Sequence, residues 1–522
     1  MIKNFPKILL SLSLLFLLSC GEKNKDTLVI GTKLDGVISL DPAEAFEIHV
    51  LDYLDNAYTP LVACDPKNPE LIIGLAAESW VVSDDKRKIT FKIRPGIKFA
   101  SGNTLTAHDV AFSLQRTVIL KKNPSEIISQ FGFTEENVKE KIRALDDETL
   151  VFEMDDSCAP TLVLYCLTAN SGAGIVDQKE VMKHEVDGDM GHLWLKTNHA
   201  GSGPFKLKSW KPKESISVES HKDHFWGAPK IDKMVFQHIG DDSSSILMLE
   251  KGDIDILKGF DLTSEQIGKV RENIRMERVS QGVTRFLMLN QKVPELQIPE
   301  VRQAIRHLID YNGIVNTQLK GEAFVHQTFI PMGFFGALDE NPYDYNIEKA
   351  QALLDKVGLR NKLTFTLETE NSEQGQALQS SFSKGGIVLK INLGDKKQLL
   401  TKYRERRYEM GLSFWIPDYF DPHNNAATFG RNPDNSDAAK SKTILWRTGW
   451  VDPELDKIVM MAKKEENPEK RKDLYYKLQR KLLDSSIINM FQYDRILLIR
   501  DNVQGIVFSS GSNKVFYKDV HK

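Results

Sequence analysis

Two hydrophobic periodicities alternate along this chain. Over residues 88–94 apolar and polar side chains alternate one by one, which predicts a half-buried strand, and Pro95-Gly96 then predicts a turn. Comparable patterns predict further strands at residues 28–32, 216–220, 234–239, 286–290 and 363–367.

Other segments have the period of an amphipathic helix. Thr106 and Asp109 have the spacing of a capping box, and apolar residues then recur every four positions from Val110. Three more helices are predicted to begin at Pro299, at Asn346, with an end near Gly358, and at Asn467. Because strand and helix signals mix along the whole chain, the predicted fold class is α/β or mixed α+β.

The first twenty residues differ from the rest. Lys3 and Lys7 precede an apolar run at residues 8–18 that is too short to span a bilayer comfortably. This layout is typical of a secretory signal and predicts a signal peptide over residues 1–19. The end of the run, Leu-Leu-Ser-Cys at 17–20, resembles a bacterial lipobox. The resemblance implies that Cys20 is lipidated and becomes the first mature residue, so the protein would be exported and lipid-anchored on the cell membrane or facing the periplasm.

Length and charge narrow the class of protein. The 522 residues carry 69 basic and 72 acidic side chains, a net charge of −3, which argues against a nucleic-acid partner. With 41% hydrophobic and 27% charged residues, the composition is that of a globular protein. At about 150 residues per domain, the length predicts about three structural units.

The remaining cysteines leave one question open. Cys158 and Cys166 could close a small loop through a disulfide in an oxidising compartment, or they could remain two buried thiols. Cys64 would then be the odd thiol and is expected to be buried.

Motifs for catalysis are missing from the sequence. It has no phosphate-binding loop, dinucleotide fingerprint, nucleophile elbow or zinc-ligand spacing, so we expect no enzyme, no cofactor and no metal. His221 and His224 are predicted to be surface residues of a polar loop. Arg404, Arg406 and Arg407 alternate with acidic residues and are predicted to form a solvated face.

One segment does suggest a binding site. Asp418 and Asp421 lie in a turn-rich stretch among four aromatic residues, Phe414, Trp415, Tyr419 and Phe420. Aromatic walls exclude water and strengthen the attraction between a carboxylate and a cation. The segment is therefore either a pocket for a cation or a capped loop packed on the core.

Several longer motifs occur in a characteristic order. They lie at 40–42 (Leu-Asp-Pro), 74–80 (Gly-Leu-Ala-Ala-Glu-Ser-Trp), 89–99, 105–116, 201–205 (Gly-Ser-Gly-Pro-Phe), 225–229 (Phe-Trp-Gly-Ala-Pro), 249–255, 301–305 and 415–422. With these motifs the chain resembles the family 5 extracellular solute-binding proteins, the receptors of peptide, nickel and related ABC importers.

The resemblance implies two α/β lobes joined by two hinge strands, with an extra domain inserted early in the first lobe. The expected divisions are lobe I at 20–60, 196–285 and 490–522, the inserted domain at 61–195 and lobe II at 286–489, with crossovers near 286–290 and 488–493. Such a receptor closes around its solute as a monomer and presents it to a permease and its ATPase. The implied ligand is a short peptide; a nickel chelate, haem or another solute, or a role in peptide-sensing signalling, are the alternatives.

The resemblance also implies where a peptide would bind. Asp418 corresponds to the residue that holds the peptide α-amine, while residues 414–416 offer backbone groups and Trp415 a wall, beside Tyr419. Val37 would contribute backbone contacts from lobe I, and Phe491 belongs to an aromatic cluster at the second hinge crossing. Leu412 stands where peptide-binding members often have an arginine. In those members the arginine is available to a peptide carboxylate. Arg285, Arg431 and Arg447 are the candidate substitutes here, or they are surface or scaffold residues.

Overall fold

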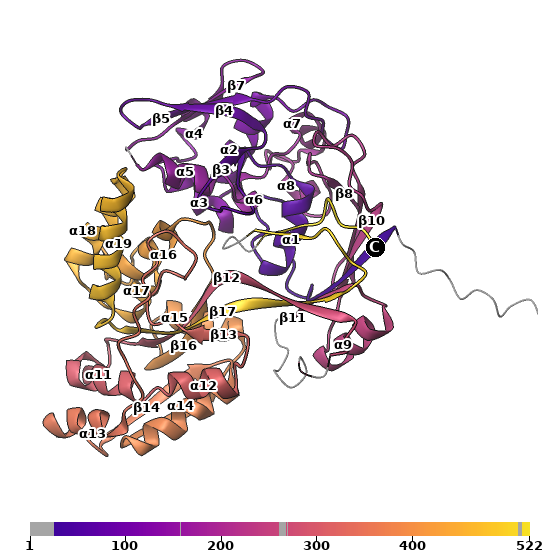
Figure 1. Ribbon diagram of the computed structural model, residues 1–522. Coiled ribbons are helices and arrows are strands. Elements are labelled where there is room, and N and C mark those ends of the chain that lie inside the picture. The colour runs from indigo at the N-terminus through magenta and orange to yellow at the C-terminus, as the bar shows by residue number, and fades with distance from the viewer. Residues whose placement is uncertain (1–25, 157, 260–267, 269, 510–513) are drawn as a thin grey trace, which may run out of the picture.

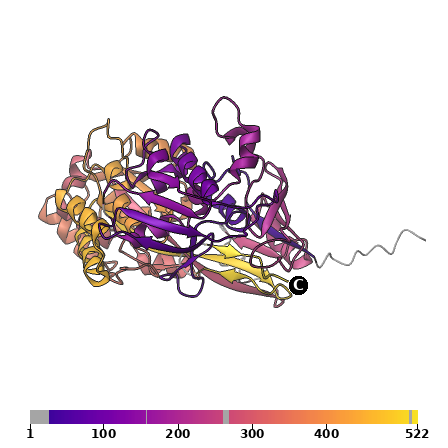
Figure 2. The same cartoon turned by 90° about the horizontal axis from the view of Figure 1, so that it is seen from above.

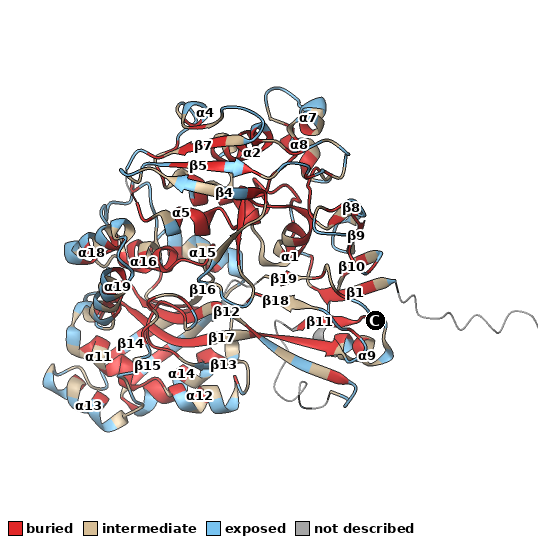
Figure 3. Cartoon of the chain, turned by 45° about the horizontal axis from the view of Figure 1, so that its top comes forward, coloured by how far each residue is buried: buried red, intermediate tan, exposed pale blue. Residues whose placement is uncertain are grey.

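A computed structural model describes residues 26–156, 158–259, 268, 270–509 and 514–522. The predicted signal peptide and Cys20 lie outside these residues. The fold is α/β, built on a sheet of eleven strands in the order β15-β14-β16-β12-β17-β11-β1-β10-β9-β8, with β13 paired to β17 (Figure 1). Strands at the centre of this sheet are buried, as Figure 3 shows.

Two long antiparallel strands, β12 (Ile274–Leu289) and β17 (Ile487–Arg500), run through both halves of the sheet. Val279 and Leu497 pack in the core of one half, whereas Leu287 and Met490 pack in the core of the other. We call these halves lobe I and lobe II. The predicted crossing points, 286–290 and 488–493, lie mostly within these strands.

Lobe I contains the five described strands that follow β17 in the order of the sheet given above. They are β1 (Thr27–Thr32), β8 (Phe205–Lys211), β9 (Ser215–Ser220), β10 (Lys233–His238) and β11 (Ile256–Gly259). Its helices are α1 (Ile48–Ala57) and α9 (Asp242–Lys251), and a short hairpin, β18 (Val507–Phe508) and β19 (Val515–Phe516), ends the chain.

Among the described residues, lobe II contains the remaining strands of this sheet and nine helices. The strands are β13 (Ala323–Val325), β14 (Leu363–Thr369), β15 (Ile387–Leu393) and β16 (Met410–Trp415). The helices are α11 (Pro299–His307), α12 (Tyr311–Thr317), α13 (Ile347–Lys356), α14 (Ser372–Lys384), α15 (Lys396–Arg404), α16 (Pro422–Gly430), α17 (Ile444–Thr448), α18 (Pro453–Lys464) and α19 (Pro468–Leu482).

A separate four-stranded sheet, in the order β4-β5-β7-β6, forms the core of a third unit, which we call the inserted domain. Its strands are β2 (Val62–Cys64), β3 (Ile72–Gly74), β4 (Ala77–Val82), β5 (Lys88–Ile93), β6 (Ile142–Ala144) and β7 (Thr149–Glu153). Its helices are α2 (Ala107–Leu120), α3 (Glu126–Ser129), α4 (Val138–Lys141), α5 (Pro160–Cys166), α6 (Asn170–Ala173), α7 (Gln178–Val181) and α8 (His192–Leu195). From above, this unit lies beside the orange and yellow helices of lobe II (Figure 2).

The helix starts predicted from the sequence are confirmed. Thr106 and Asp109 form both bonds of a capping box at α2, and Asn346 Oδ1 accepts from Lys349 N at the start of α13. Gly358 follows the end of α13 with a φ of +67°. Glycine is favoured there because this left-handed conformation strains other residues. The predicted strands correspond to β1, β5, β9, β10, β14 and the end of β12.

Close backbone contact explains the glycines of the Gly-Ser-Gly-Pro motif. A Cβ at Gly201 or Gly203 would collide with the backbone of Ala57 at the end of α1. The motif therefore packs its backbone directly against the end of α1, just before β8 begins. Gly203 N donates to Ala57 O there at 3.0 Å.

Three predictions about single side chains need correction. His221 and His224 are buried, because the turn after β9 folds back on the loop before β8, where His221 Nδ1 lies 3.0 Å from Gly203 O. Arg406 is buried too: its guanidinium lies 3.6 Å from the ring centroid of Trp446 and donates to Asn435 O. Arg404 and Arg407 are exposed, as predicted.

Cys64, Cys158 and Cys166 are free, buried thiols. Cys158 Sγ donates to Met154 Sδ at 3.5 Å, and Gln130 Nε2 donates to Cys166 Sγ at 3.4 Å. The structure therefore has the two buried thiols, without the disulfide that the spacing also allowed. Within the described ranges, no helix combines the length and the apolar character that crossing a membrane requires.

Candidate ligand-binding site

The two lobes face each other where several parallel strands end. In lobe II, β14 is parallel to both β15 and β16, and in lobe I, β1 is parallel to both β10 and β11. Ligands of open α/β sheets bind outside the carboxyl ends of such strands. The connections that leave these ends include residues 33–47, 370–371, 394–395 and 416–421.

His49 of lobe I is influenced by cations of both lobes. His49 lies in the first turn of α1 in lobe I, and Lys396 is the first residue of α15 in lobe II. Burial lowers the pKa of His49 to about 4, and the neighbouring cations Lys258, Arg495 and Lys396 contribute to this shift. One of these cations, Lys396, belongs to lobe II.

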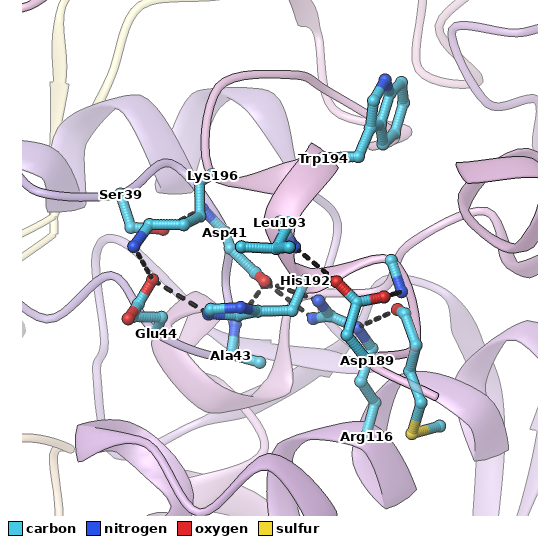
Figure 4. A network of polar contacts seen from close by, with 12 residues as sticks. Ser39, Asp41, Ala43, Glu44, Arg116, Asp189, His192, Leu193, Trp194 and Lys196 are labelled. Atoms are coloured by element: carbon cyan, nitrogen blue, oxygen red, sulfur yellow. Dashed lines mark hydrogen bonds and ion pairs between the residues drawn. The ribbon is translucent and has the colours of Figure 1, made fainter. Parts of the chain in front are cut away.

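The connection from β1 to α1 is anchored by a buried ion pair. Arg116 of α2 donates to both carboxylate oxygens of Asp41, at 2.6 and 2.5 Å, and the two side chains are 1% and 0% exposed (Figure 4). Beside it, His192 Nε2 and Lys196 Nζ lie 3.0 and 3.5 Å from Glu44. The Leu-Asp-Pro motif therefore fixes this lobe I connection on the inserted domain.

Asp418 lies in the turn between β16 and α16. Asn424 of α16 holds it twice: Asp418 N donates to Asn424 Oδ1 at 3.0 Å, and Asn424 Nδ2 donates to Asp418 Oδ2 at 3.1 Å. Among the residues that the structure describes, no cationic group lies within 4 Å of this carboxylate. Desolvation raises the pKa of Asp418 from 3.8 to about 6, and the Asn424 hydrogen bond opposes the rise only in part.

Asp421, three residues later, has a different role. Its Oδ1 accepts from His423 N at the start of α16, and Arg471 of α19 donates to both of its oxygens at 2.9 and 2.8 Å. Asp421 and Arg471 are both buried. Asp421 therefore caps a helix packed on the core, which is one of the two readings that the sequence allowed, whereas no cation of the described residues pairs with Asp418.

The aromatic residues around Asp418 point to different neighbours. The ring of Phe414 has two cations near it, with Arg285 Cζ at 6.0 Å and Lys396 Nζ at 4.8 Å from its centroid. Trp415 is half-buried, and within the described part of the chain its buried indole Nε1 has no acceptor. Ile416 is half-buried between Trp415 and the Asp418 turn.

Tyr419 turns towards the inserted domain. It is 7% exposed, and its hydroxyl donates to Gln130 Oε1 at 3.3 Å. Phe420 follows it into the same contact, with its ring 5.9 Å from that of Tyr165. Tyr419 is thus placed to join lobe II to the inserted domain next to Asp418.

The other two predicted ligand residues are buried. Val37 is 8% exposed, and its amide donates to Leu34 O at 3.2 Å, so its carbonyl is the backbone group that remains for a ligand. Phe491 is 0% exposed and packs edge-on against Tyr311 in the core of lobe II. The structure therefore does not bring the Phe491 side chain to the Asp418 segment.

The three candidate arginines also separate. Arg431 donates to Asp456 of α18 at 2.8 Å, and Arg447 donates to Lys442 O at 3.2 Å. Only Arg285 of the three stacks on an aromatic residue of the Asp418 segment. Sequence reasoning missed Asn424 and Lys396, because the first follows Asp418 by six residues in a helix and the second comes from a different strand end.

Sequence comparison decides the family. Residues 71–437 match the family described as bacterial extracellular solute-binding proteins, family 5 Middle. The chain belongs to this family. The family 5 protein is 30% identical over 506 residues to the probable D,D-dipeptide-binding periplasmic protein DdpA of Escherichia coli, covering 94% of this chain and 93% of DdpA.

Solved structures share the fold of this family 5 protein. One is the periplasmic binding protein DppA from Helicobacter pylori in complex with the peptide STSA, with a TM-score of 0.77 and 24% identity over 95% of this chain and 98% of DppA. Another is NikZ from Campylobacter jejuni in complex with Ni(L-His), with a TM-score of 0.75 and 21% identity over 95% of this chain and all (100%) of NikZ. The two-lobed fold is therefore shared by proteins with different ligands.

Proposed function

We propose that this family 5 protein captures short peptides outside the cytoplasmic membrane and delivers them to an ABC permease. The observation that carries the proposal is the carboxylate of Asp418, which is desolvated and oriented by Asn424 and has no cation within 4 Å in the described chain. A peptide α-ammonium supplies the missing charge. The name of DdpA and the peptide complex of DppA support a peptide as the ligand.

Binding energy would come from replacing water around both charges at once. An ionised carboxylate is costly to keep desolvated, and an ammonium that donates to it removes that cost. Trp415 Nε1 and the backbone of residues 414–416 can then bond the peptide main chain, which every peptide presents. Recognition of this kind tolerates many peptide sequences.

Closure would proceed by bending at the two long strands. A β-bulge interrupts the pairing of β12 and β17 between Ser280 and Val283, where the strands pass from lobe I to lobe II. Gly282, with φ of +64°, gives this point a backbone conformation that other residues rarely adopt. We propose that the lobes turn about this bulge and that the ligand stabilises the closed state. Cys20 would hold the receptor at the membrane through its lipid.

A binding screen tests the proposal. The mature chain is mixed with di- to pentapeptides, and its melting temperature is measured for wild type, Asp418→Asn and the control Asp437→Asn, whose side chain is 79% exposed. We expect peptides to raise the melting temperature of wild type and control but not of Asp418→Asn. A folded wild-type protein that no peptide stabilises would refute the proposal.

A further inference from the structure

Gln492 lies where the two long strands pass from one lobe to the other. It belongs to β17, is 1% exposed, and pairs with Thr284 of β12 on the lobe II side of the bulge. Ser280 is the last residue of β12 that pairs with β17 on the lobe I side, where its partner is Asp494. Ser280 and Gln492 therefore lie on opposite sides of the point about which the lobes are proposed to turn.

The carboxamide of Gln492 is held in one orientation by the backbone of Met332. Its Oε1 accepts from Met332 N at 2.6 Å, and its Nε2 donates to Met332 O at 3.1 Å, so these contacts also assign the oxygen and the nitrogen of the amide. A primary amide has two N–H donors, and one of them remains. Nε2 donates it to Ser280 Oγ at 3.3 Å. The amide thus joins the two sides of the bulge.

The loop that contains Met332, residues 329–334 of lobe II, is attached to the elements of the candidate ligand site. Asn425 of α16 is 0% exposed, and its Nδ2 donates to the carbonyl of the first loop residue, Phe329, at 2.7 Å. The last loop residue, Phe334, has its ring 4.4 Å from that of Phe420. The loop and the candidate site are therefore parts of one packed unit.

The same loop packs on the bulge. A Cβ at Gly282 would lie 2.9 Å from Phe334 Cε2 and 3.2 Å from Pro331 Cγ, so the loop covers the backbone of the bulge closely. A change in the angle between the lobes would alter this packing and the distance between Ser280 and Gln492.

We infer that Gln492 is a positioning residue for ligand capture, which stabilises the closed angle of the hinge through its bond to Ser280. The inference rests on the proposed function, because it takes closure around a peptide as the step that Gln492 assists. A hydrogen bond between neutral groups shifts an equilibrium about two- to tenfold, and 3.3 Å is long for such a bond, so the lower part of this range applies. The bond slows peptide release without touching the peptide.

Stopped-flow fluorescence with tri-alanine tests the inference. The proteins are wild type, Ser280→Ala, Ser280→Thr and the control Ser381→Ala, whose buried hydroxyl donates to Leu378 O inside α14. Ser280→Ala should raise the dissociation rate constant about threefold and leave the association rate constant unchanged, because the bond belongs to the closed state. Ser280→Thr, which retains a hydroxyl, and Ser381→Ala should release tri-alanine at the wild-type rate. A purely structural role would change the free energy of unfolding and leave the dissociation rate as it is.

Two further measurements complete the test. Gln492→Leu also removes both bonds to Met332 and should raise the dissociation rate constant at least about tenfold. Small-angle X-ray scattering without peptide needs no ligand. The radius of gyration of Ser280→Ala should exceed that of wild type, whereas the radius of Ser280→Thr should equal it, because the alanine variant populates the open state more.

The outcomes separate this inference from the proposed function. If wild type binds tri-alanine and Ser280→Ala releases it at the wild-type rate, the role of Gln492 is refuted and the proposed function stands. If the folded wild type binds no peptide, the proposed function fails and scattering decides, because equal radii in wild type and Ser280→Ala would refute the inference and a larger radius in the variant would support it. If Gln492→Leu does not fold, Ser280→Ala still decides, since it removes one hydroxyl from a half-buried residue.

Discussion

Asp418 and Asp41 are both carboxylates in connections that face the space between the lobes, but their surroundings differ. Asp41 has a bidentate partner in Arg116, and both side chains are fully buried. Asp418 is held, among the residues that the structure describes, by the amide of Asn424 and by no cation. Asp421, three residues away, repeats the first arrangement with Arg471.

The difference separates fixed parts of the fold from the proposed binding site. A buried ion pair with both partners present holds two segments in one geometry, and removing one partner leaves an uncompensated charge. A desolvated carboxylate without a cation weakens the empty protein and favours any ligand that supplies one. Asp41 and Asp421 thus hold the two connections in place, and Asp418 is the carboxylate that we propose for the ligand.

The largest effect is expected at the Asp41 pair. Arg116→Met should lower the free energy of unfolding by about 3–5 kcal/mol, because Asp41 remains buried without its cation. Denaturant titration measures this value. The control Lys121→Met removes an exposed ion pair with Glu135 and should change stability far less. Equal losses in the two variants would contradict the assignment of Asp41 and Arg116 as a structural pair.

Asp418→Asn should weaken ligand binding without destabilising the protein, unlike Arg116→Met. Affinity for tri-alanine should fall at least about 100-fold, because a desolvated charge pair is lost, while the empty protein at pH 7 keeps or gains stability. The gain follows from linkage: a carboxyl whose pKa is raised on folding costs stability as pH rises from about 4 through about 6. Calorimetry and denaturant titration measure the two quantities. A destabilised variant would show that Asp418 is structural.

The affinity for peptide should change with pH as the Asp418 carboxyl is protonated. Because the pKa of Asp418 is raised to about 6, the dissociation constant for tri-alanine should be constant from about pH 6.5 to 7.5 and rise about tenfold per unit below 6. Calorimetry from pH 4.5 to 7.5 tests this. A constant affinity down to pH 4.5 would place the ammonium at a carboxylate with an ordinary pKa.

The smallest effect concerns the contact between lobe II and the inserted domain. Lys463 of α18 donates from Nζ to Gln130 O at 3.1 Å, and its carbonyl accepts from Ala159 N at 2.9 Å. Lys463→Met removes the first bond and should weaken peptide binding about fivefold if the contact helps to keep the lobes closed. Lys464→Met, one residue away and exposed, is the control. An unchanged affinity would mean that the contact does not contribute to closure.

Local signals predicted much of the fold. The capping box at Thr106, the Asn346 cap and the alternation over 88–94 depend on nearby residues, and each appears in the structure. Burial of isolated charged residues was not predictable in this way. Arg406 lies in a charged stretch, yet it stacks on Trp446, forty residues later, and such contacts leave no mark in a local pattern.

The candidate site was predictable only in part. Asp418 stands out because a carboxylate among aromatic residues is unusual, and its motif resembles that of the family. The cations near Phe414 of β16 were not predictable, because Arg285 of β12 and Lys396 of α15 are more than one hundred residues apart in the sequence. Sheet order brings them together, since β12 pairs with β16, and the sequence alone does not reveal that order.

A crystal structure of the mature protein with tri-alanine would test the central claim most directly. We expect the α-ammonium nitrogen of the peptide to lie within about 3 Å of the Asp418 carboxylate, between the residue 33–47 connection of lobe I and the residue 414–424 segment of lobe II. A peptide bound with its ammonium away from Asp418, or a carboxylate that keeps only Asn424 as its neighbour, would contradict the account.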